Sequence, residues 1–313
     1  SLKMANKIIF MGTPIFCVHI LKSLYQNGYN ISVVFTQPPQ KSHRGQKINK
    51  SPIQGISETL NIDYRTPKTL KDNHEEYEFL KELNADLAIV CAYGQIIPEN
   101  FLNLTKKGFV NIHASILPSW RGAAPIQRSI MNLDPETGIS IMKIKKELDS
   151  GPVSNIYKIK IDQNQNAQEI SEKLSALAAE KILDNVDDIL EDKAKFIDQD
   201  HSKATYAKKI DKEESRIDWD EDASKIIGKI NGLFPSPGAS FSFNGERYKI
   251  LKAEIGNGIG QVGEIISNQL EVACNKNQSI KILEIQRQGK RPQKISEFML
   301  GSQIKKGSKL SNV

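Results

Sequence analysis

The stretch KIIFMGTPIFCVHILKSLYQNGYNISVVF, residues 7–35, decides the fold. Residues 7–11 form a run that is apolar after the initial Lys7, which is typical of a buried strand. Residues 16–26 then place apolar side chains at helical spacing, and Gly28 follows shortly after them. A second apolar run covers residues 31–35. Strand, helix and strand in this order predict a right-handed β-α-β unit of a parallel sheet.

The same pattern continues along the chain. Apolar runs recur at residues 87–91, 109–113 and 139–144, with polar or helical segments between them. They predict an α/β domain with a doubly wound, mostly parallel, Rossmann-like sheet. Residues 153–161 alternate like a strand, and residues 167–190 form a long amphipathic segment that we expect to be a helix closing this domain.

A different pattern begins after the polar residues 198–213, which we interpret as a linker. Short apolar runs there are separated by Asn-Gly and Gly-rich turns. They predict strands at residues 239–243, 248–251, 260–266 and 280–285. We therefore expect residues 1–197 to form the α/β domain and residues 214–313 to form a smaller antiparallel β-barrel, similar to an OB-fold.

Composition limits the class of protein. The chain has 313 residues, 39% of them hydrophobic and 26% charged, which is ordinary for a globular protein. No apolar run reaches the ~18 residues of a membrane span, so we expect a cytoplasmic protein, and a monomer. Cys17, Cys91 and Cys274 are too far apart for a short-spaced metal or redox motif, and we expect no metal.

The charge favours an anionic partner. The net charge is +6 and the pI is about 9.0. Residues 270–313 contain nine Lys or Arg against three Glu, so the basic character is concentrated in the second predicted domain. A positively charged barrel face is a common surface for binding nucleic acid.

Two common nucleotide-binding motifs are missing. Gly12 ends the first strand, but Thr13, Pro14 and Ile15 follow it, so the three spaced glycines of a dinucleotide fingerprint are absent. The lysine-serine signature of a P-loop is absent too. The sequence therefore disfavours nicotinamide chemistry and the commonest form of ATP chemistry in this fold class.

The densest group of polar residues follows the run at 109–113. Asn111 and His113 are two residues apart on the predicted strand, so their side chains share one face where that strand ends. The predicted strand 139–144 leads within a few residues to Asp149, which we expect at the same edge of the sheet. A carboxamide, an imidazole and a carboxylate suit acyl transfer to an amine, in which an oxyanion develops and a proton moves.

At these residues the sequence resembles the formyltransferase family. Asn111, His113 and Asp149 match the family's Asn-x-His pair and later Asp. Narrower similarities, over residues 120–126 and in the second predicted domain, are to the methionyl-tRNA formyltransferases, which move formyl from 10-formyltetrahydrofolate to methionine on initiator tRNA in translation initiation. The resemblance implies that Asn111, His113 and Asp149 are catalytic. It also implies folate contacts at Ser115, Ile116, Leu117, Pro118, Tyr93, Gly94 and Ile96.

The resemblance also implies tRNA contacts. Members of this kind carry a basic loop after the second strand, and residues 37–50 contain several Lys and Arg but no acid. The expected tRNA-binding residues are Lys41, Arg44, Lys47, Lys50, Lys290 and Arg291. The sequence departs from the family pattern at two positions, because Ser236 stands where Trp is usual and Lys50 stands where Pro is usual.

Three other functions remain open at this point. The chain could formylate an amino sugar or glycinamide ribotide, neither of which needs a basic second domain. It could release formate hydrolytically from the same folate, which needs no acceptor. It could also be an RNA-binding module with an inactive pocket, although intact Asn111, His113 and Asp149 argue against that reading.

Overall fold

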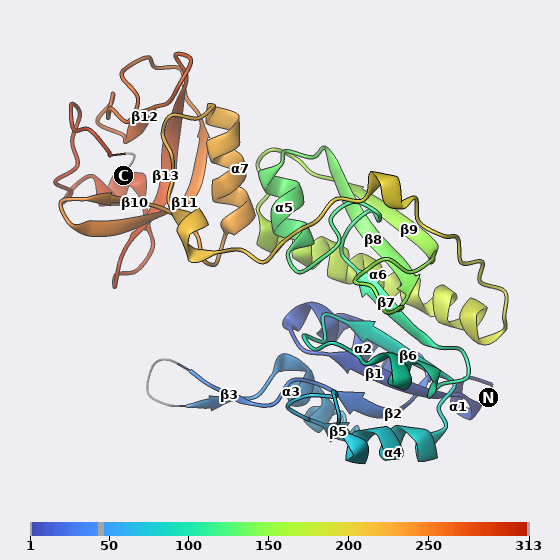
Figure 1. The fold of residues 1–313 in the computed structure, drawn as a ribbon. Helices are drawn as coiled ribbons and strands as arrows, with labels where there is room; N and C mark the ends of the chain where they lie inside the picture. Colours follow the sequence, from blue (N-terminus) through green and yellow to red (C-terminus); the bar gives the residue numbers. More distant parts are fainter. Residues whose placement is uncertain (1, 43–46, 312–313) are drawn as a thin grey trace. The chain divides into compact units, whose positions relative to one another are not determined.

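The computed structural model describes residues 2–42 and 47–311. The chain forms two compact units (Figure 1). Unit 1 comprises the residues up to 122 together with residues 138–159 and 171–206. Unit 2 comprises residues 123–137, residues 160–170 and the chain from residue 207 onward. The units therefore do not follow each other along the chain, and each is described separately.

Unit 1 is built on a seven-stranded sheet with the order β5-β2-β1-β6-β7-β8-β9. Its strands are β1 (Lys7–Gly12), β2 (Asn30–Phe35), β5 (Tyr64–Arg65), β6 (Leu87–Cys91), β7 (Phe109–His113), β8 (Glu136–Lys143) and β9 (Val153–Lys160). The first five of these pair in parallel, whereas β8 is antiparallel to β7. The predicted mostly parallel α/β sheet is confirmed.

Helices cover both faces of this sheet (Figure 1). They are α1 (Leu2–Ala5), α2 (Ile15–Gln26), α3 (Pro52–Thr59), α4 (His74–Leu83) and α6 (Ala167–Leu190), and short 3₁₀ turns occupy Glu99–Asn103 and His201–Lys203. The bounds of α6 are those predicted from its apolar stripe. Its polar side also contributes to packing, because Ser175 Oγ donates to Phe16 O of α2 at 2.7 Å.

The basic loop after β2 contains a short β-hairpin. Strands β3 (Gln40–Lys41) and β4 (Ile48–Asn49) pair antiparallel, and Ser42 N donates to Lys47 O at 2.9 Å. The hairpin extends beside α3 in Figure 1. Both strands are exposed, so the β3–β4 hairpin presents its lysine side chains to solvent. Residues 43–46 lie outside the described residues.

Unit 2 contains the antiparallel sheet predicted for the second domain. Its strands are β10 (Ala239–Phe243), β11 (Glu246–Ile255), β12 (Glu271–Ala273), β13 (Ser279–Arg287) and β14 (Gln293–Lys294), and its helices are α5 (Pro125–Met131), α7 (Ala223–Leu233), α8 (Ile295–Phe298) and a 3₁₀ turn at Lys212–Ser215. The sheet has the order β10-β11-β13-β12, with β14 beside β13. It curls around a core that includes the fully buried Trp219.

Helices α5 and α7 of unit 2 pack closely because α7 carries two glycines. A Cβ at Gly232 would lie 2.5 Å from Met131 Cγ and 3.0 Å from Gln127 O. A Cβ at Gly228 would lie 2.8 Å from Leu133 Cδ2. A Cβ at Gly232 would therefore press on the α5 backbone as well as on Met131, whereas at Gly228 the Leu133 side chain would have to move first.

The strand predicted at residues 260–266 is wrong. Within the described chain this segment forms only isolated bridges, from Glu264 to Lys309 and from Ile265 to Val272. Gly263 interrupts it with φ of +84°, a left-handed conformation that breaks an extended strand. The apolar alternation there serves core packing, since Ile265 is fully buried.

Candidate active site

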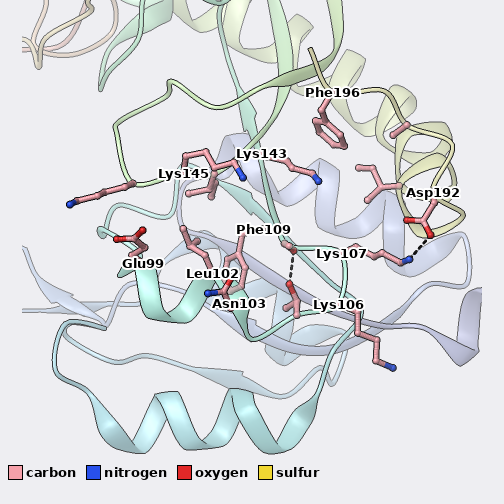
Figure 2. A pocket seen from close by; sticks show the side chains of 16 residues that line it. Glu99, Leu102, Asn103, Lys106, Lys107, Phe109, Lys143, Lys145, Asp192 and Phe196 are labelled. Atoms are coloured by element: carbon pink, nitrogen blue, oxygen red, sulfur yellow. Dashed lines mark hydrogen bonds and ion pairs between the residues drawn. The ribbon is translucent and has the colours of Figure 1, made fainter. Parts of the chain in front are cut away.

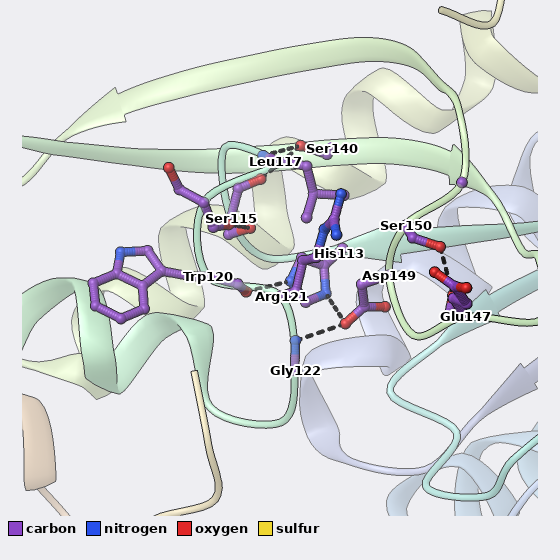
Figure 3. A network of polar contacts seen from close by, with 12 residues as sticks. His113, Ser115, Leu117, Trp120, Arg121, Gly122, Ser140, Glu147, Asp149 and Ser150 are labelled. Carbon is purple, nitrogen blue, oxygen red and sulfur yellow. Dashed lines mark hydrogen bonds and ion pairs between the residues drawn. The ribbon is translucent and has the colours of Figure 1, made fainter. Parts of the chain in front are cut away.

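His113 and Asp149 lie beside each other in unit 1 (Figure 3). His113 is the last residue of β7, and its Nδ1 is 3.6 Å from Asp149 Oδ2. His113 is 7% exposed and Asp149 is 8% exposed, so little water reaches the two side chains. Interactions between charged groups are stronger in such a site than in bulk water.

The route of the chain to Asp149 differs from the predicted one. Because β8 is antiparallel to β7, it ends beside Val110, near the start of β7 and away from His113. Residues 144–152 then turn back and bring Asp149 to the imidazole. Two backbone features accompany this return: Asp149 has φ of +50°, and Gly151 packs directly on Lys143 O. The predicted proximity therefore arises from a loop rather than from adjacent parallel strand ends.

The hydrogen bonds of His113 fix the tautomer of its neutral ring. Nε2 lies 2.8 Å from Trp120 O, and a carbonyl oxygen can only accept a hydrogen bond. Nε2 therefore carries the proton in the neutral imidazole, and Nδ1 presents a lone pair toward Asp149. Asp149 Oδ2 already accepts from Gly122 N at 2.8 Å, so its orientation does not depend on the imidazole. The geometry therefore leaves Nδ1 able to accept a proton from a substrate amine.

Asn111 lies two residues before His113 on β7, so both side chains project from the same face of the strand. Its carboxamide makes no hydrogen bond with any residue that the structure describes, and Asn111 is only partly buried. A carboxamide near an imidazole and still able to donate can hold a substrate oxygen.

The loop after β7 is held by its own hydrogen bonds. Ser115 Oγ donates to Ser119 O at 2.6 Å, while Ser140 Oγ donates to Ser115 O and accepts from Leu117 N (Figure 3). Ser115 is fully buried and Leu117 is 4% exposed. Of the predicted folate contacts in this loop, these two side chains have almost no surface to offer a ligand, so their contribution is the shape of the loop that carries Ile116 and Pro118.

The second predicted folate segment follows β6. Tyr93 is 2% exposed, and its hydroxyl has no hydrogen-bond partner among the described residues. Burial and the nearby Glu76 raise the pKa of Tyr93, so the phenol stays neutral. Gly94 has φ of +89° and lies against Gln37, whereas Ile96 is 88% exposed. Tyr93 thus forms a wall, and Ile96 offers apolar surface.

A cavity of about 540 Å³ lies at the start of β7, away from His113, and none of the predicted catalytic or folate-binding residues line it (Figure 2). Leu102, Phe109 and Ile144 form apolar parts of its wall. Phe109 begins β7 and Ile144 begins the loop to Asp149, and Ile144 N donates to Phe109 O at 2.8 Å. Its polar and charged lining residues include Asn103, Lys106, Lys107, Lys143, Lys145, Lys146, Glu99 and Asp192.

The structure adds residues that sequence reasoning missed. Gln199 lies in the segment predicted as a linker, yet it is 8% exposed and bonds to Arg121, Asp149 and Gly151. Arg121 is 4% exposed and also donates to His201 Nδ1 at 2.8 Å. No local pattern could have revealed these partners, because they come from segments far apart in the sequence.

The basic residues predicted to bind tRNA are exposed where they are described. Lys41 and Lys47 flank the β3–β4 hairpin, whereas Arg44 lies outside the described residues. Lys50 Nζ pairs with Glu58 at 2.9 Å. In unit 2, Lys290 and Arg291 are exposed beside β13, and Arg291 lies 3.3 Å from Glu297.

In the described ranges, no group of three or more His, Cys, Asp or Glu is arranged to hold a metal ion. None of the helices in residues 2–42 and 47–311 is long and apolar enough to cross a membrane.

Comparison with known proteins identifies the family. The formyl transferase family profile matches residues 6–186, and the profile of the formyl transferase C-terminal domain matches residues 209–303. A methionyl-tRNA formyltransferase of Pelagibacter ubique is 66% identical over 310 residues, which cover 99% of this chain and all of the relative. The enzyme of the same name from Mesorhizobium japonicum is 39% identical, with 98% of this chain and all of the relative covered.

The fold is also shared with a solved structure. The crystal structure of WlaRD, a sugar 3N-formyl transferase in the presence of dTDP and 5-N-formyl-THF, has a TM-score of 0.69. It covers 92% of this chain and all of its own, at 20% identity, which shows a shared fold. The profiles and the full-length identities have a plain consequence: the chain belongs to the formyltransferase family, among the methionyl-tRNA formyltransferases.

Proposed function

We propose that this chain transfers a formyl group from 10-formyltetrahydrofolate to the α-amino group of methionine on initiator methionyl-tRNA. The observation that carries the chemistry is the lone pair of His113 Nδ1 facing Asp149 at 3.6 Å, on the strand that also carries Asn111. The identity of 66% to a methionyl-tRNA formyltransferase over nearly the whole chain supports the choice of acceptor.

The catalytic roles follow from the hydrogen bonds. The amine nitrogen attacks the formyl carbon, and the formyl oxygen becomes anionic and accepts from the Asn111 carboxamide. The amine proton moves to His113 Nδ1, because Nε2 is already protonated and bonded to Trp120 O. The imidazolium that forms then faces the Asp149 carboxylate, which stabilises its charge.

Collapse of the intermediate completes the transfer. The bond between the formyl carbon and N10 of the folate breaks, and the proton on His113 Nδ1 passes to N10 as tetrahydrofolate leaves. The amine keeps the formyl group, so one carbon–nitrogen bond forms and one breaks, with no net proton or redox change. His113 ends as the Nε2–H tautomer in which it began.

We propose that the folate ring system binds at the end of the sheet that carries His113, where the loop after β7 and the segment after β6 both begin. The loop 115–118 and the segment around Tyr93, Gly94 and Ile96 keep the folate contacts proposed for them from the sequence.

For the tRNA we propose contacts by the β3–β4 hairpin in unit 1 and by Lys290 and Arg291 in unit 2. The cations of the hairpin are solvent-exposed where described, which suits phosphate contacts. Lys50 would have to exchange Glu58 for a phosphate, so we expect it to contribute less than Lys41 or Lys47.

One assay tests the proposal. Purified protein is mixed with labelled 10-formyltetrahydrofolate and with methionyl-tRNA of initiator or elongator type. We expect label on the initiator methionyl-tRNA, with much slower transfer to the elongator. Label on small amines with indifference to tRNA, or formate released without an acceptor, would replace this proposal with a different formyltransferase or a hydrolase. Binding of tRNA without formylation would reduce the protein to an RNA-binding module.

A further inference from the structure

We infer that Gln199 is a positioning residue, which holds Asp149 in place beside His113 for the proposed formyl transfer. The inference rests on the proposed function for its kinetic consequences, but its structural content stands by itself. Gln199 would contribute no atom to the reaction. It would act by fixing two loops of unit 1 against each other. One loop carries Asp149, and the other carries Gly122, whose backbone N–H donates to the Asp149 carboxylate.

The amide nitrogen of Gln199 holds the loop of Asp149. Nε2 donates to Asp149 O at 2.9 Å and to Gly151 O at 2.7 Å, so both of its hydrogens are used. Gln199 is 8% exposed, and few water molecules can replace it at these two carbonyl oxygens. Losing the side chain would leave two buried acceptors without their donor.

The amide oxygen of Gln199 holds the facing loop. Oε1 accepts from Arg121 Nε at 3.2 Å and from one terminal guanidinium nitrogen at 2.9 Å. The next residue, Gly122, donates its backbone N–H to Asp149 Oδ2. The side chain of Gln199 therefore holds Asp149 in two ways. It donates directly to the main-chain carbonyl of Asp149. It also supports the carboxylate indirectly, because Arg121, which it binds, is adjacent to Gly122.

Asp149 needs such support because its contact with His113 does not hold it, and its carboxylate accepts from Gly122 N, in the loop that Gln199 also fixes. Its distance of 3.6 Å to His113 Nδ1 is too long for a hydrogen bond, and the neutral ring has no proton there to donate. Its left-handed φ of +50° is uncommon for residues other than glycine, although Asp adopts it more often than most.

Gln199 is itself held in place. Ile197 exchanges backbone hydrogen bonds with Val153, the first residue of β9, at 2.8 and 2.9 Å. Farther along the same segment, Thr205 O accepts from Arg121 N at 2.9 Å. Gln199 thus lies on a strap, residues 197–205, that is fixed near both ends to the loops it joins. A rigid support is what a positioning residue requires.

The first test compares two buried amides. Gln199→Met keeps the size of the side chain and removes its hydrogen bonds. Asn185→Leu is the matched control, because Asn185 is 3% exposed and its Nδ2 also makes two donations, to Lys181 O and Tyr157 Oη within unit 1. We expect both variants to lower the melting temperature. Only Gln199→Met should lower kcat, by about 100-fold, the typical effect of a displacement near 1 Å at a reacting centre.

The second test asks whether Gln199 acts through Asp149. Single-turnover formylation is measured for Asp149→Asn, for Gln199→Met and for the double variant. If Gln199 acts by placing the carboxylate, the double variant should be no slower than Asp149→Asn within about twofold. A further 100-fold loss in the double variant would refute the inference, since Gln199 would then act independently of Asp149.

A third readout needs no activity and so separates this inference from the proposed function. The Gly122 amide is observed by NMR hydrogen exchange, because its N–H bonds to Asp149 Oδ2. We expect faster exchange in Gln199→Met and in Asp149→Asn, and no change in Asn185→Leu. Gln199→Glu serves if the Met variant folds poorly: it keeps the oxygen that accepts from Arg121 and loses the donations to Asp149 and Gly151, so exchange should again be faster. Unchanged protection of Gly122 in the Gln199 variants would overturn the inference even in an active enzyme.

Discussion

Replacement of Gly151 by alanine should separate catalysis from folding. A Cβ at Gly151 would lie 1.8 Å from Lys143 O and 2.9 Å from the carbonyl carbon of the same residue. Both atoms belong to backbone that cannot rotate away. Ordinary contact requires about 3.4 Å, so the loop must move by about 1.6 Å at this point. Asp149 is two residues away in the same return loop.

The expected magnitude follows from that displacement. A shift of about 1 Å at a reacting centre costs roughly 100-fold in rate, so kcat should fall about 100-fold. Overpacking of this kind costs about 1–3 kcal/mol of the free energy of unfolding, which leaves a domain of this size folded. KM for methionyl-tRNA should change little, because the predicted tRNA contacts lie elsewhere in the sequence.

The assay is steady-state formylation at saturating folate, together with urea unfolding. Gly232→Ala is the matched control: its Cβ would lie 2.5 Å from Met131 Cγ in unit 2, so it also costs stability through a steric clash. We expect kcat of the control to stay within about twofold of the parent enzyme. If Gly151→Ala lost stability like the control but kept its kcat, the return loop would not be what places Asp149.

The other predictions concern three side chains. Asn111→Ala should lower kcat by about 100-fold or more if the carboxamide binds the developing oxyanion, and near-normal turnover in the formylation assay would contradict that role. Tyr93→Phe should leave the free energy of unfolding unchanged or raise it by about 1 kcal/mol, since the buried hydroxyl has no described partner; urea unfolding would refute this by showing a clear loss. Arg128 lowers the pKa of Glu214 to about 2, through an ion pair of 2.5 Å in unit 2. The stability from this pair is therefore present above about pH 4.5 and lost as the pH falls toward 2, so Glu214→Gln should flatten the melting-temperature profile over that window, and an unchanged slope would show that the pair contributes nothing.

The sequence predicted the elements whose apolar pattern is strong. The bounds of β7 and α6 agree with the predicted ranges because a buried run and a long amphipathic stripe leave little choice of structure. Residues 260–266 show the limit of that reasoning, since alternation in a turn with a left-handed Gly263 looks the same as alternation in a strand.

Strand direction and long-range polar contacts could not be predicted. Periodicity is identical for parallel and antiparallel strands, so nothing in residues 139–144 indicated that β8 runs against β7. Asp149 was expected near His113, but through a different path of the chain. Gln199 carries no signal of its own, because its partners are two backbone carbonyls about fifty residues earlier and a guanidinium about eighty residues earlier.

Unit 2 is assembled from three separate stretches of the chain, which has a practical consequence for the design of truncated fragments. Helix α5 and residues 160–170 come before the main body of unit 2 in the chain, yet they pack within it, and Asn231 of α7 donates to Gln163 O at 2.9 Å. A fragment truncated at residue 206 would therefore retain α5 while losing the glycine-bearing helix that shields it. Such a fragment would expose the face of α5 that α7 covers, and it would tend to aggregate. An isolated catalytic fragment therefore requires polar substitutions on that face of α5 rather than a different truncation point.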